Sequence, residues 1–158
     1  MNANALKGMA IVSLQEGTKL GAIDQPLFDM AARQLGALAI SGDAGHFLVP
    51  FPQIQQIGSD AVTVASSQVT QTPSTGSVLG ALLSLQDLGK LKVVDQAGTL
   101  LGTIHDVDID PVSGQITQLT AHKGGLLGVG GTSTPIDAAA ILMVGPDLLT
   151  VTTTATPG

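Results

Sequence analysis

The sequence has no cysteine, tryptophan or tyrosine among its 158 residues, and aromatic side chains make up only 2% of it. Without cysteine there are no disulfides, no thiolate chemistry and no cysteine-ligated zinc sites. Without tryptophan and tyrosine the chain lacks the rings on which bases of single-stranded RNA usually stack. The three phenylalanines, Phe28, Phe47 and Phe51, alternate with small residues, which predicts that they lie in the core.

Charged side chains are also scarce. They account for 11% of the residues, less than half of the roughly 25% that is usual in soluble domains. Six basic residues stand against 12 acidic ones, so the formal net charge of −6 repels phosphate and makes nucleic acid an unlikely partner. The low charge instead favours an exterior that is partly covered by protein partners.

Long hydrophobic runs are missing as well. The apolar run Met9–Ser13 is too short for a signal peptide or a membrane span. The longest charge-free stretch, residues 61–86, is interrupted by Pro73 and is rich in Ser, Thr and Gln. We therefore expect a cytoplasmic protein that does not span a membrane, with export by a route that needs no N-terminal signal left open.

The most informative feature that is present is a duplication. The segment Gly17–Ile23 returns 81 positions later as Gly98–Ile104, and matches at this offset continue in both directions without a gap. Further along, Gly58–Val64 is echoed by Gly145–Val151. A solenoid would need at least three short repeats, so two units of this length predict two small tandem domains.

Each unit contains five or six short runs of β-forming residues separated by turn signals. Because so many short strands leave exposed edges in an open sheet, we predict an all-β protein of two small β-barrels in tandem. After Pro50 and Pro135 the apolar spacing changes, which predicts a short helical turn in each barrel. The residues with this spacing are Ile54, Ile57, Ile141 and Val144. We place the domains at residues 1–66 and 87–154, a Ser/Thr/Gln/Pro-rich linker at 67–86 and a tail at 155–158.

One ordered set of positions recurs in the two units, although neither unit fills every position: a leading Gly, then G-x-x-L-G-x-[IV], an acidic residue ending the second strand, a turn Gly, a V-P element and a closing G-x-D-x-V-x-V. The first unit supplies Gly8, Gly17, Leu20, Gly21, Ile23, Asp29, Val49-Pro50 and residues 58–64. The second supplies Gly89, Gly98, Leu101, Gly102, Ile104, Asp106, Asp110, Gly114, Pro135 and residues 145–151. In this set the sequence resembles the PRC-barrel family. The resemblance implies tandem PRC-type barrels that act as noncatalytic docking modules.

Three aspartates form the densest group of potential metal ligands. Asp106, Asp108 and Asp110 occupy alternate positions of a predicted strand, which places their carboxylates on one face, where a hard cation such as Ca²⁺ or Mg²⁺ would bind. An EF-hand loop, however, needs glycine at its sixth and an acid at its twelfth position, where this chain has Pro111 and Thr117. We therefore favour a solvated strand face over a cation site, which is the only cofactor candidate.

Two apolar segments are candidates for docking onto another protein. The glycine-rich stretch 124–131 lacks the Lys-Ser/Thr ending of a phosphate-binding P-loop, so we interpret it as a hairpin tip that docks. The second segment lies in the linker. The candidate interaction residues are Leu126, Leu127, Val129, Val78, Leu79, Leu82 and Leu83.

The remaining reactive side chains suggest no catalytic site. His46, His105 and His122 lack zinc-ligand spacing, so we interpret them as surface or hydrogen-bonded residues. No serine lies in a G-x-S-x-G motif, and cysteine is absent. We predict that the protein is not an enzyme.

These observations favour a noncatalytic scaffold or adaptor that self-associates or docks onto a protein partner. Duplicated modules with few charges suit a homo-oligomer, and nonidentical complementary faces would extend it into a filament. One alternative is a metal- or small-ligand-responsive module. Another is an accessory factor in RNA processing, which the acidic composition makes less attractive.

Overall fold

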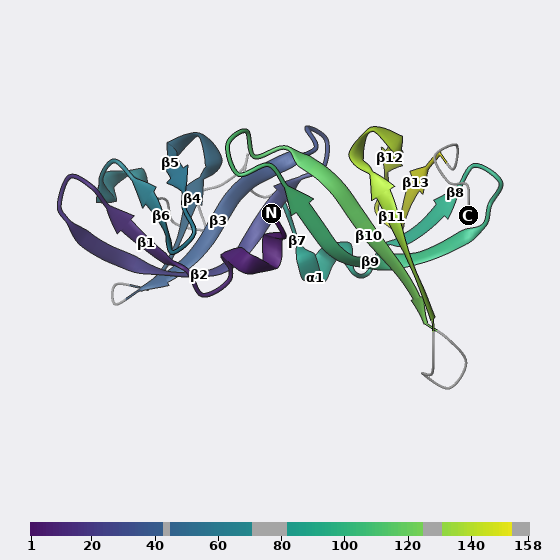
Figure 1. Ribbon diagram of the computed structural model, residues 1–158, viewed down its shortest axis with the longest axis horizontal. Helices are drawn as coiled ribbons and strands as arrows, with labels where there is room; N and C mark the ends of the chain where they lie inside the picture. Colours follow the sequence, from purple (N-terminus) through teal and green to yellow (C-terminus); the bar gives the residue numbers. More distant parts are fainter. Residues whose placement is uncertain (43–44, 71–81, 125–130, 153–158) are drawn as a thin grey trace.

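The computed structural model describes residues 1–42, 45–70, 82–124 and 131–152. We call residues 1–70 the first half and 82–152 the second half. Each half is built on a six-stranded path of hydrogen-bonded strands, in the order β4-β3-β2-β1-β6-β5 or β11-β10-β9-β8-β13-β12. Figure 1 shows these as two strongly curved sheets that lie side by side. The prediction of an all-β protein with two small barrels in tandem is confirmed.

Apart from β7 and η3, the elements follow one another in the same order in both halves. In the first half they are η1 (Ala3–Leu6), β1 (Ala10–Ser13), β2 (Thr18–Asp29), β3 (Gln34–Gly42), β4 (Gly45–Pro50), η2 (Phe51–Gln53), β5 (Ile54–Ile57), β6 (Ala61–Val64) and η3 (Ser67–Val69). In the second half they are β7 (Leu83–Ser84), α1 (Leu85–Leu88), β8 (Lys92–Asp95), β9 (Leu100–Ile109), β10 (Ile116–Gly124), β11 (Gly131–Asp137), η7 (Ala138–Ala140), β12 (Ile141–Val144) and β13 (Leu148–Val151). The proposed domain limits stay a prediction.

The duplication extends to strand register. In the first half Phe28 pairs with Leu35, and in the second half Ile109 pairs with Ile116, 81 residues on. Apart from Asp29–Gln34, the remaining pairs of the β2–β3 ladder all have counterparts in the β9–β10 ladder, and so do the two register shifts. The two halves are therefore the same structure built twice.

The match is not free of gaps, which corrects one expectation. Gly21 pairs with Ile11, whereas its counterpart Gly102 pairs with Val93, so the offset is 82 residues in β1 and 81 in β2. The chain from Ile11 to its partner Gly21 is one residue longer than the chain from Val93 to Gly102. Val93 is thus the counterpart of Ile11, and both are fully buried.

The predicted helical turns are present but shorter than expected. They cover only η2 and η7, while Ile54–Ile57 and Ile141–Val144 form strands. In each of these strands the register shifts by one residue, so two inward side chains stand three positions apart, as in a helix. The predicted equivalence of the two prolines is also wrong, because Pro50 matches Asp137 in register and Pro135 lies two residues earlier, in β11.

A close approach between strands explains the second glycine of the repeated motif. A Cβ atom built on Gly21 would lie 2.3 Å from the Ser41 carbonyl oxygen, and one on Gly102 would lie 2.2 Å from that of His122. Both contacts are with backbone, which cannot rotate away. Glycine is therefore required where the backbone of β2 comes close to that of β3, and where the backbone of β9 comes close to that of β10.

The two halves meet in a pseudo-twofold contact. The Leu35 amide donates to the Gly114 carbonyl at 2.7 Å, and the Ile116 amide donates to the Arg33 carbonyl at 2.8 Å. Each of these bonds is the counterpart of the other at an offset of 81 residues. The halves thus contact each other as the two subunits of a symmetric dimer do.

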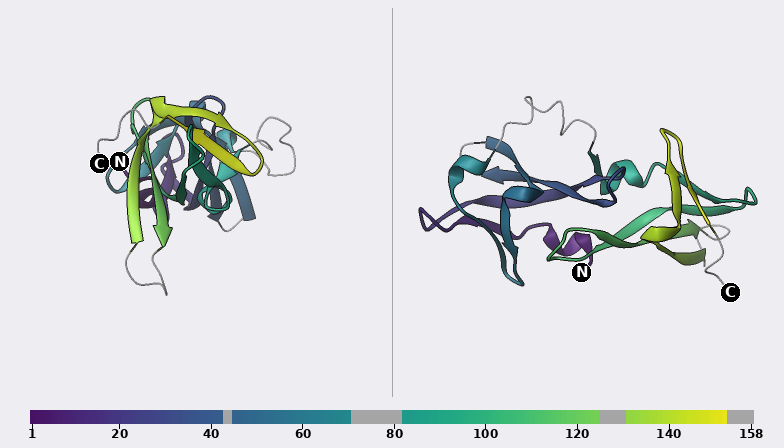
Figure 2. Two further views of the ribbon diagram at one scale, coloured as in Figure 1. Left: turned by 90° about the vertical axis from the view of Figure 1, so that its right-hand side faces the viewer. Right: turned by 90° about the horizontal axis from the view of Figure 1, so that it is seen from above.

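Each half also contributes a short leading segment to the other half's sheet. Leu83–Ser84 pairs with β2, and the first two residues run beside β9, where the Ile109 amide donates to the Met1 carbonyl at 2.8 Å. Asn2 and Ser84 then cap the helical turns that follow, η1 and α1. Figure 2 shows these turns near the middle of the molecule.

One hydrophobic core runs through both halves. The buried apolar residues form a single cluster that includes Phe28 and Leu35 from the first half and Leu88, Ile109 and Ile116 from the second. Phe28 is fully buried, as predicted, while Phe47 and Phe51 pack against the cluster and are half-buried. The tandem barrels therefore share one hydrophobic core instead of each having its own.

A single carboxylate ties η3 to the first barrel. Glu16 accepts hydrogen bonds from the hydroxyls of Ser13 and Ser67 and from the Ser67 amide, 3.1 Å from its Oε1. The Ser13 hydroxyl is the main cause that holds the pKa of Glu16 below its ordinary value of 4.5, and Ser67 adds to the effect.

We expect Glu16→Gln to remove a contribution to stability that depends on pH. Because the folded-state pKa is lowered, this contribution is complete above the ordinary value of 4.5 and is lost as pH falls through the folded-state pKa. Urea unfolding at pH 6 and at acidic pH, followed by circular dichroism, should show the two proteins converging as the pH is lowered. A difference that is the same at both pH values would contradict this role.

Candidate docking face

The hairpin of β12 and β13 exposes a group of apolar side chains. The register shift at Leu142 turns both Leu142 and Met143 outward, opposite Thr150. These two side chains are 51% and 67% exposed, and Leu148 on β13 is 43% exposed. We call Leu142, Met143, Pro146 and Leu148 the docking face.

The first half provides an internal comparison for this face. At the positions of Leu142, Met143 and Leu148 the first half has Gln55, Gln56 and Ala61. The inward positions, in contrast, are apolar in both halves; they are Ile54, Ile57 and Val62 in one and Ile141, Val144 and Leu149 in the other. The fold therefore requires apolar residues only on the inner side, and the outer apolar residues of β12–β13 need another explanation.

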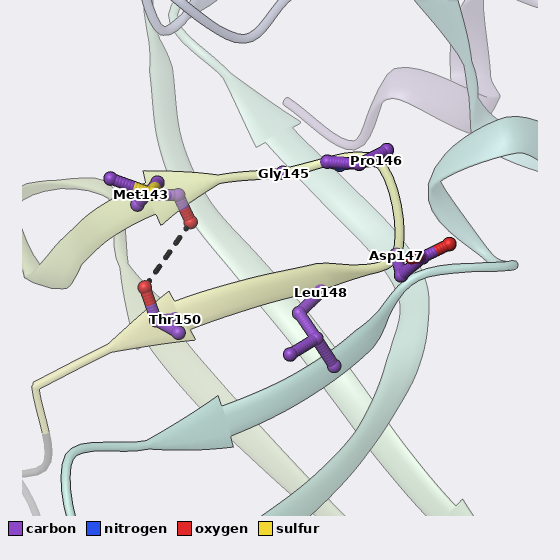
Figure 3. Close-up of a pocket in the computed structure, with 6 residues that line it drawn as sticks. All are labelled: Met143, Gly145, Pro146, Asp147, Leu148 and Thr150. Carbon is purple, nitrogen blue, oxygen red and sulfur yellow. Dashed lines mark hydrogen bonds between the residues drawn. The ribbon is translucent and has the colours of Figure 1, made fainter.

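A surface pocket of about 240 Å³ lies on this hairpin, as Figure 3 shows. It is lined by Met143, Gly145, Pro146, Asp147, Leu148 and Thr150. The Thr150 hydroxyl donates to the Met143 carbonyl at 3.4 Å across the hairpin. Asp147 is the only charged residue in this lining, so the pocket suits an apolar side chain.

A second pocket, of about 430 Å³, continues the first toward the other half. It shares Met143, Gly145 and Pro146 with the first pocket, and its far wall includes Met30 and Arg33 from the β2–β3 turn. The two pockets together border the docking face.

Arg33 fixes the hairpin against the first half. Its backbone has φ +57°, which non-glycine residues rarely adopt. Its guanidinium donates to the Met30 carbonyl and, at 3.4 Å, to the Ile141 carbonyl of β12. The position of the docking face therefore depends on contacts from both halves.

The three predicted acidic ligands take part in hydrogen bonds within the protein. Asp106 Oδ1 accepts from the side-chain amides of Asn2 at 3.3 Å and Asn4 at 3.0 Å. Asp110 Oδ1 accepts from the Val112 amide at 2.8 Å, which stabilises the β9–β10 turn. The Thr117 hydroxyl donates to the backbone carbonyl of Asp108 at 3.2 Å.

No group of three or more His, Asp or Glu side chains able to hold a metal ion occurs in residues 1–42, 45–70, 82–124 and 131–152. A cation at Asp106, Asp108 and Asp110 stays a prediction.

Most of the predicted interaction residues lie outside the described residues. These are Val78, Leu79, Leu126, Leu127 and Val129. Leu82 is described, and its side chain packs over Gly36. A Cβ atom built on Gly36 would lie 2.6 Å from Leu82 Cδ2. Leu83 belongs to β7, is half-buried and packs against the core. A docking role for these seven residues stays a prediction.

The histidines lie at or near the surface, and two of them are neighbours, which their spacing did not predict. His46 Nδ1 lies 3.6 Å from Asp24 Oδ2 at the surface of the first half. His105 and His122 lie next to each other on β9 and β10, with ring centroids 4.9 Å apart. Seventeen residues separate them in sequence, so the pairing becomes visible only once the hairpin register is known.

A comparison with models of protein families agrees with this duplicated fold. The family model described as PRC-barrel domain matches twice, over residues 1–71 and 81–156. The chain belongs to the PRC-barrel domain family. A search of curated proteins found no relative.

Among solved structures, one similar chain is a putative 16S ribosomal RNA processing protein, RimM, from Pseudomonas aeruginosa. The match has 12% identity and a TM-score of 0.31, and it covers 93% of this chain and 95% of that one. Within the described parts of these PRC barrels, no helix has the length and apolar character needed to cross a membrane.

Proposed function

We propose that this pair of PRC barrels is a noncatalytic assembly module that self-associates through the docking face on β12–β13. The observation that carries the proposal is the difference between two hairpins of identical register, one polar outside and the other apolar. Outward leucine and methionine contribute nothing to the barrel interior. They lower the free energy of the protein only when another surface covers them.

A second copy of the chain suits this face because β12 is the last strand on its sheet path. Its four residues, Ile141–Val144, include no charge and no proline, the usual devices that keep edge strands apart. Two β12 strands placed antiparallel would form a twofold contact in which the same residues meet from both copies. Asp147 is the only charge in the lining of the first adjoining pocket, and the second is lined by two charges of opposite sign, Asp29 and Arg33, so little repulsion opposes this contact.

A role in assembly also agrees with the rest of the molecule. The chain has no cysteine and no G-x-S-x-G motif, so the usual nucleophile arrangements are missing from its sequence. The described histidines and carboxylates do not gather into a trio that could activate water through a metal. Among the described residues the feature that supports a role is therefore the surface for binding on β12–β13.

The test replaces the docking face by the residues of the first half, in the triple variant Leu142→Gln/Met143→Gln/Leu148→Ala. We expect the wild-type protein to form dimers at about 10–100 μM, as judged by light scattering after gel filtration, and the triple variant to be monomeric. The variant should fold, because the β5–β6 hairpin already carries these residues.

The matched control is Leu14→Gln, which removes a 56% exposed leucine from the first half and should leave the dimer intact. A wild-type protein that stays monomeric over the whole concentration range would overturn the proposal. So would a triple variant that associates as strongly as the wild type.

A further inference from the structure

A histidine pair lies on the β9–β10 hairpin and takes no part in the lining of the two pockets beside the docking face. His122 is paired with Thr103 in the ladder, and the register shift between Thr120 and Ala121 leaves His105 as an extra, exposed residue on β9. This shift brings the two rings together, with centroids 4.9 Å apart and planes tilted by 59°. No salt bridge or apolar packing in the described residues accounts for the pairing.

The spacing of the rings matches that of two imidazoles bound to one metal ion. With a metal–nitrogen bond of about 2.0–2.1 Å, each ring centroid lies roughly 3.2 Å from the metal, and a tetrahedral angle separates the centroids by about 5 Å. The observed separation is 4.9 Å. Neither histidine is buried, so water can complete the coordination of an ion bound between the two rings.

One ring is also held in an orientation that suits a ligand. His122 Nδ1 lies 3.1 Å from the Ser133 hydroxyl on β11. When Nδ1 carries the proton and donates it to this hydroxyl, Nε2 keeps a free lone pair. Metal-binding histidines generally use such an outer partner to fix the tautomer and the ring.

We propose that His105 and His122 bind a divalent transition metal ion of the zinc, nickel or copper class, with Ser133 as the positioning residue. Imidazole nitrogen favours these ions over Ca²⁺ and Mg²⁺, which prefer oxygen. The site is separate from the three aspartates, since the carboxylate of the adjacent Asp106 is bonded to the amides of Asn2 and Asn4.

The experiment is a calorimetric titration of the untagged full chain with ZnCl₂ and with NiCl₂. We expect one ion per chain, and at least about a tenfold loss of affinity in His105→Ala and in His122→Ala. Ser133→Ala should weaken binding less than either histidine variant does. His46→Ala is the matched control and should bind like the wild type, because this residue lies in the other half.

A second measurement keeps the test independent of how the variants fold. In the wild-type protein, Ni²⁺ should broaden the NMR signals of His105 and His122 before those of His46, and MgCl₂ should not. The proposal is overturned if zinc does not bind at about 1 mM, or if both histidine variants fold and bind it as the wild type does.

Discussion

Replacing Gly114 by alanine should destabilise the protein by about 2–5 kcal/mol, through overpacking and an unfavourable backbone angle together. Gly114 has φ +75°, and a Cβ atom there would lie 2.5 Å from Cζ of Phe51. The same residue accepts the Leu35 amide across the pseudo-twofold contact. Moving its backbone to relieve the clash would therefore disturb the junction between the halves.

Two further variants separate the causes. Gly98 has φ +82°, and a Cβ atom there would have no heavy atom within 4 Å. Gly98→Ala therefore reports the cost of the unfavourable backbone angle alone, about 1–2 kcal/mol. In a Phe51→Ala background, Gly114→Ala should cost clearly less than in the wild type, because the ring it meets is gone. Urea unfolding followed by circular dichroism gives these values, since the chain has no tryptophan for fluorescence.

Equal losses of unfolding free energy in Gly114→Ala and Gly98→Ala would contradict the clash. So would a cost of Gly114→Ala that is the same in the Phe51→Ala background as in the wild type.

The counterparts of these residues show how the junction is made specific. Arg33 stands where the second half has Gly114, and Ala138 stands where the first half has Phe51. The ring of Phe51 in the first half thus faces Gly114 in the second. In the equivalent pair, Arg33 belongs to the first half and Ala138 to the second. Two first halves placed in the same contact would bring the large partners together. This asymmetry favours pairing between unlike halves.

The repeat predicted much of this fold, because the glycines and inward apolar residues are dictated by geometry. Gly21 and Gly102 stand where strands cross too closely for a Cβ atom, and the same physical need recurs in both halves. Spacing alone misjudged Ile54–Ile57, since a strand with a register shift and a helical turn both place apolar residues three apart. Only the partner strand distinguishes the two, and that is not a local property.

The docking face shows a different limit. The contrast between Gln55-Gln56 and Leu142-Met143 is present in the sequence. It gains meaning only when the inward and outward positions of each strand are known, because an apolar run by itself fits a core strand equally well. The histidine pair likewise depends on a register shift in β9–β10 that no pattern of residues in the sequence predicts.

Replacing Phe28 by alanine tests whether the two barrels act as one folding unit. Phe28 is the largest fully buried side chain, and its backbone pairs with Leu83 of the second half. Truncation of such a ring costs about 3–5 kcal/mol, a large share of the stability of a domain. Because a single core cluster runs through both halves, we expect the second half to lose the same free energy as the first.

Hydrogen exchange measured residue by residue decides this, because it reports each half separately. Amides of Val93 and Leu149 in the second half should lose as much protection in Phe28→Ala as those of Ile11 and Val62 in the first. Val112→Ala, at a side chain that is 89% exposed, is the control and should change stability by less than about 0.5 kcal/mol. If protection fell only in the first half, the barrels would be separate folding units and the shared core would not couple them.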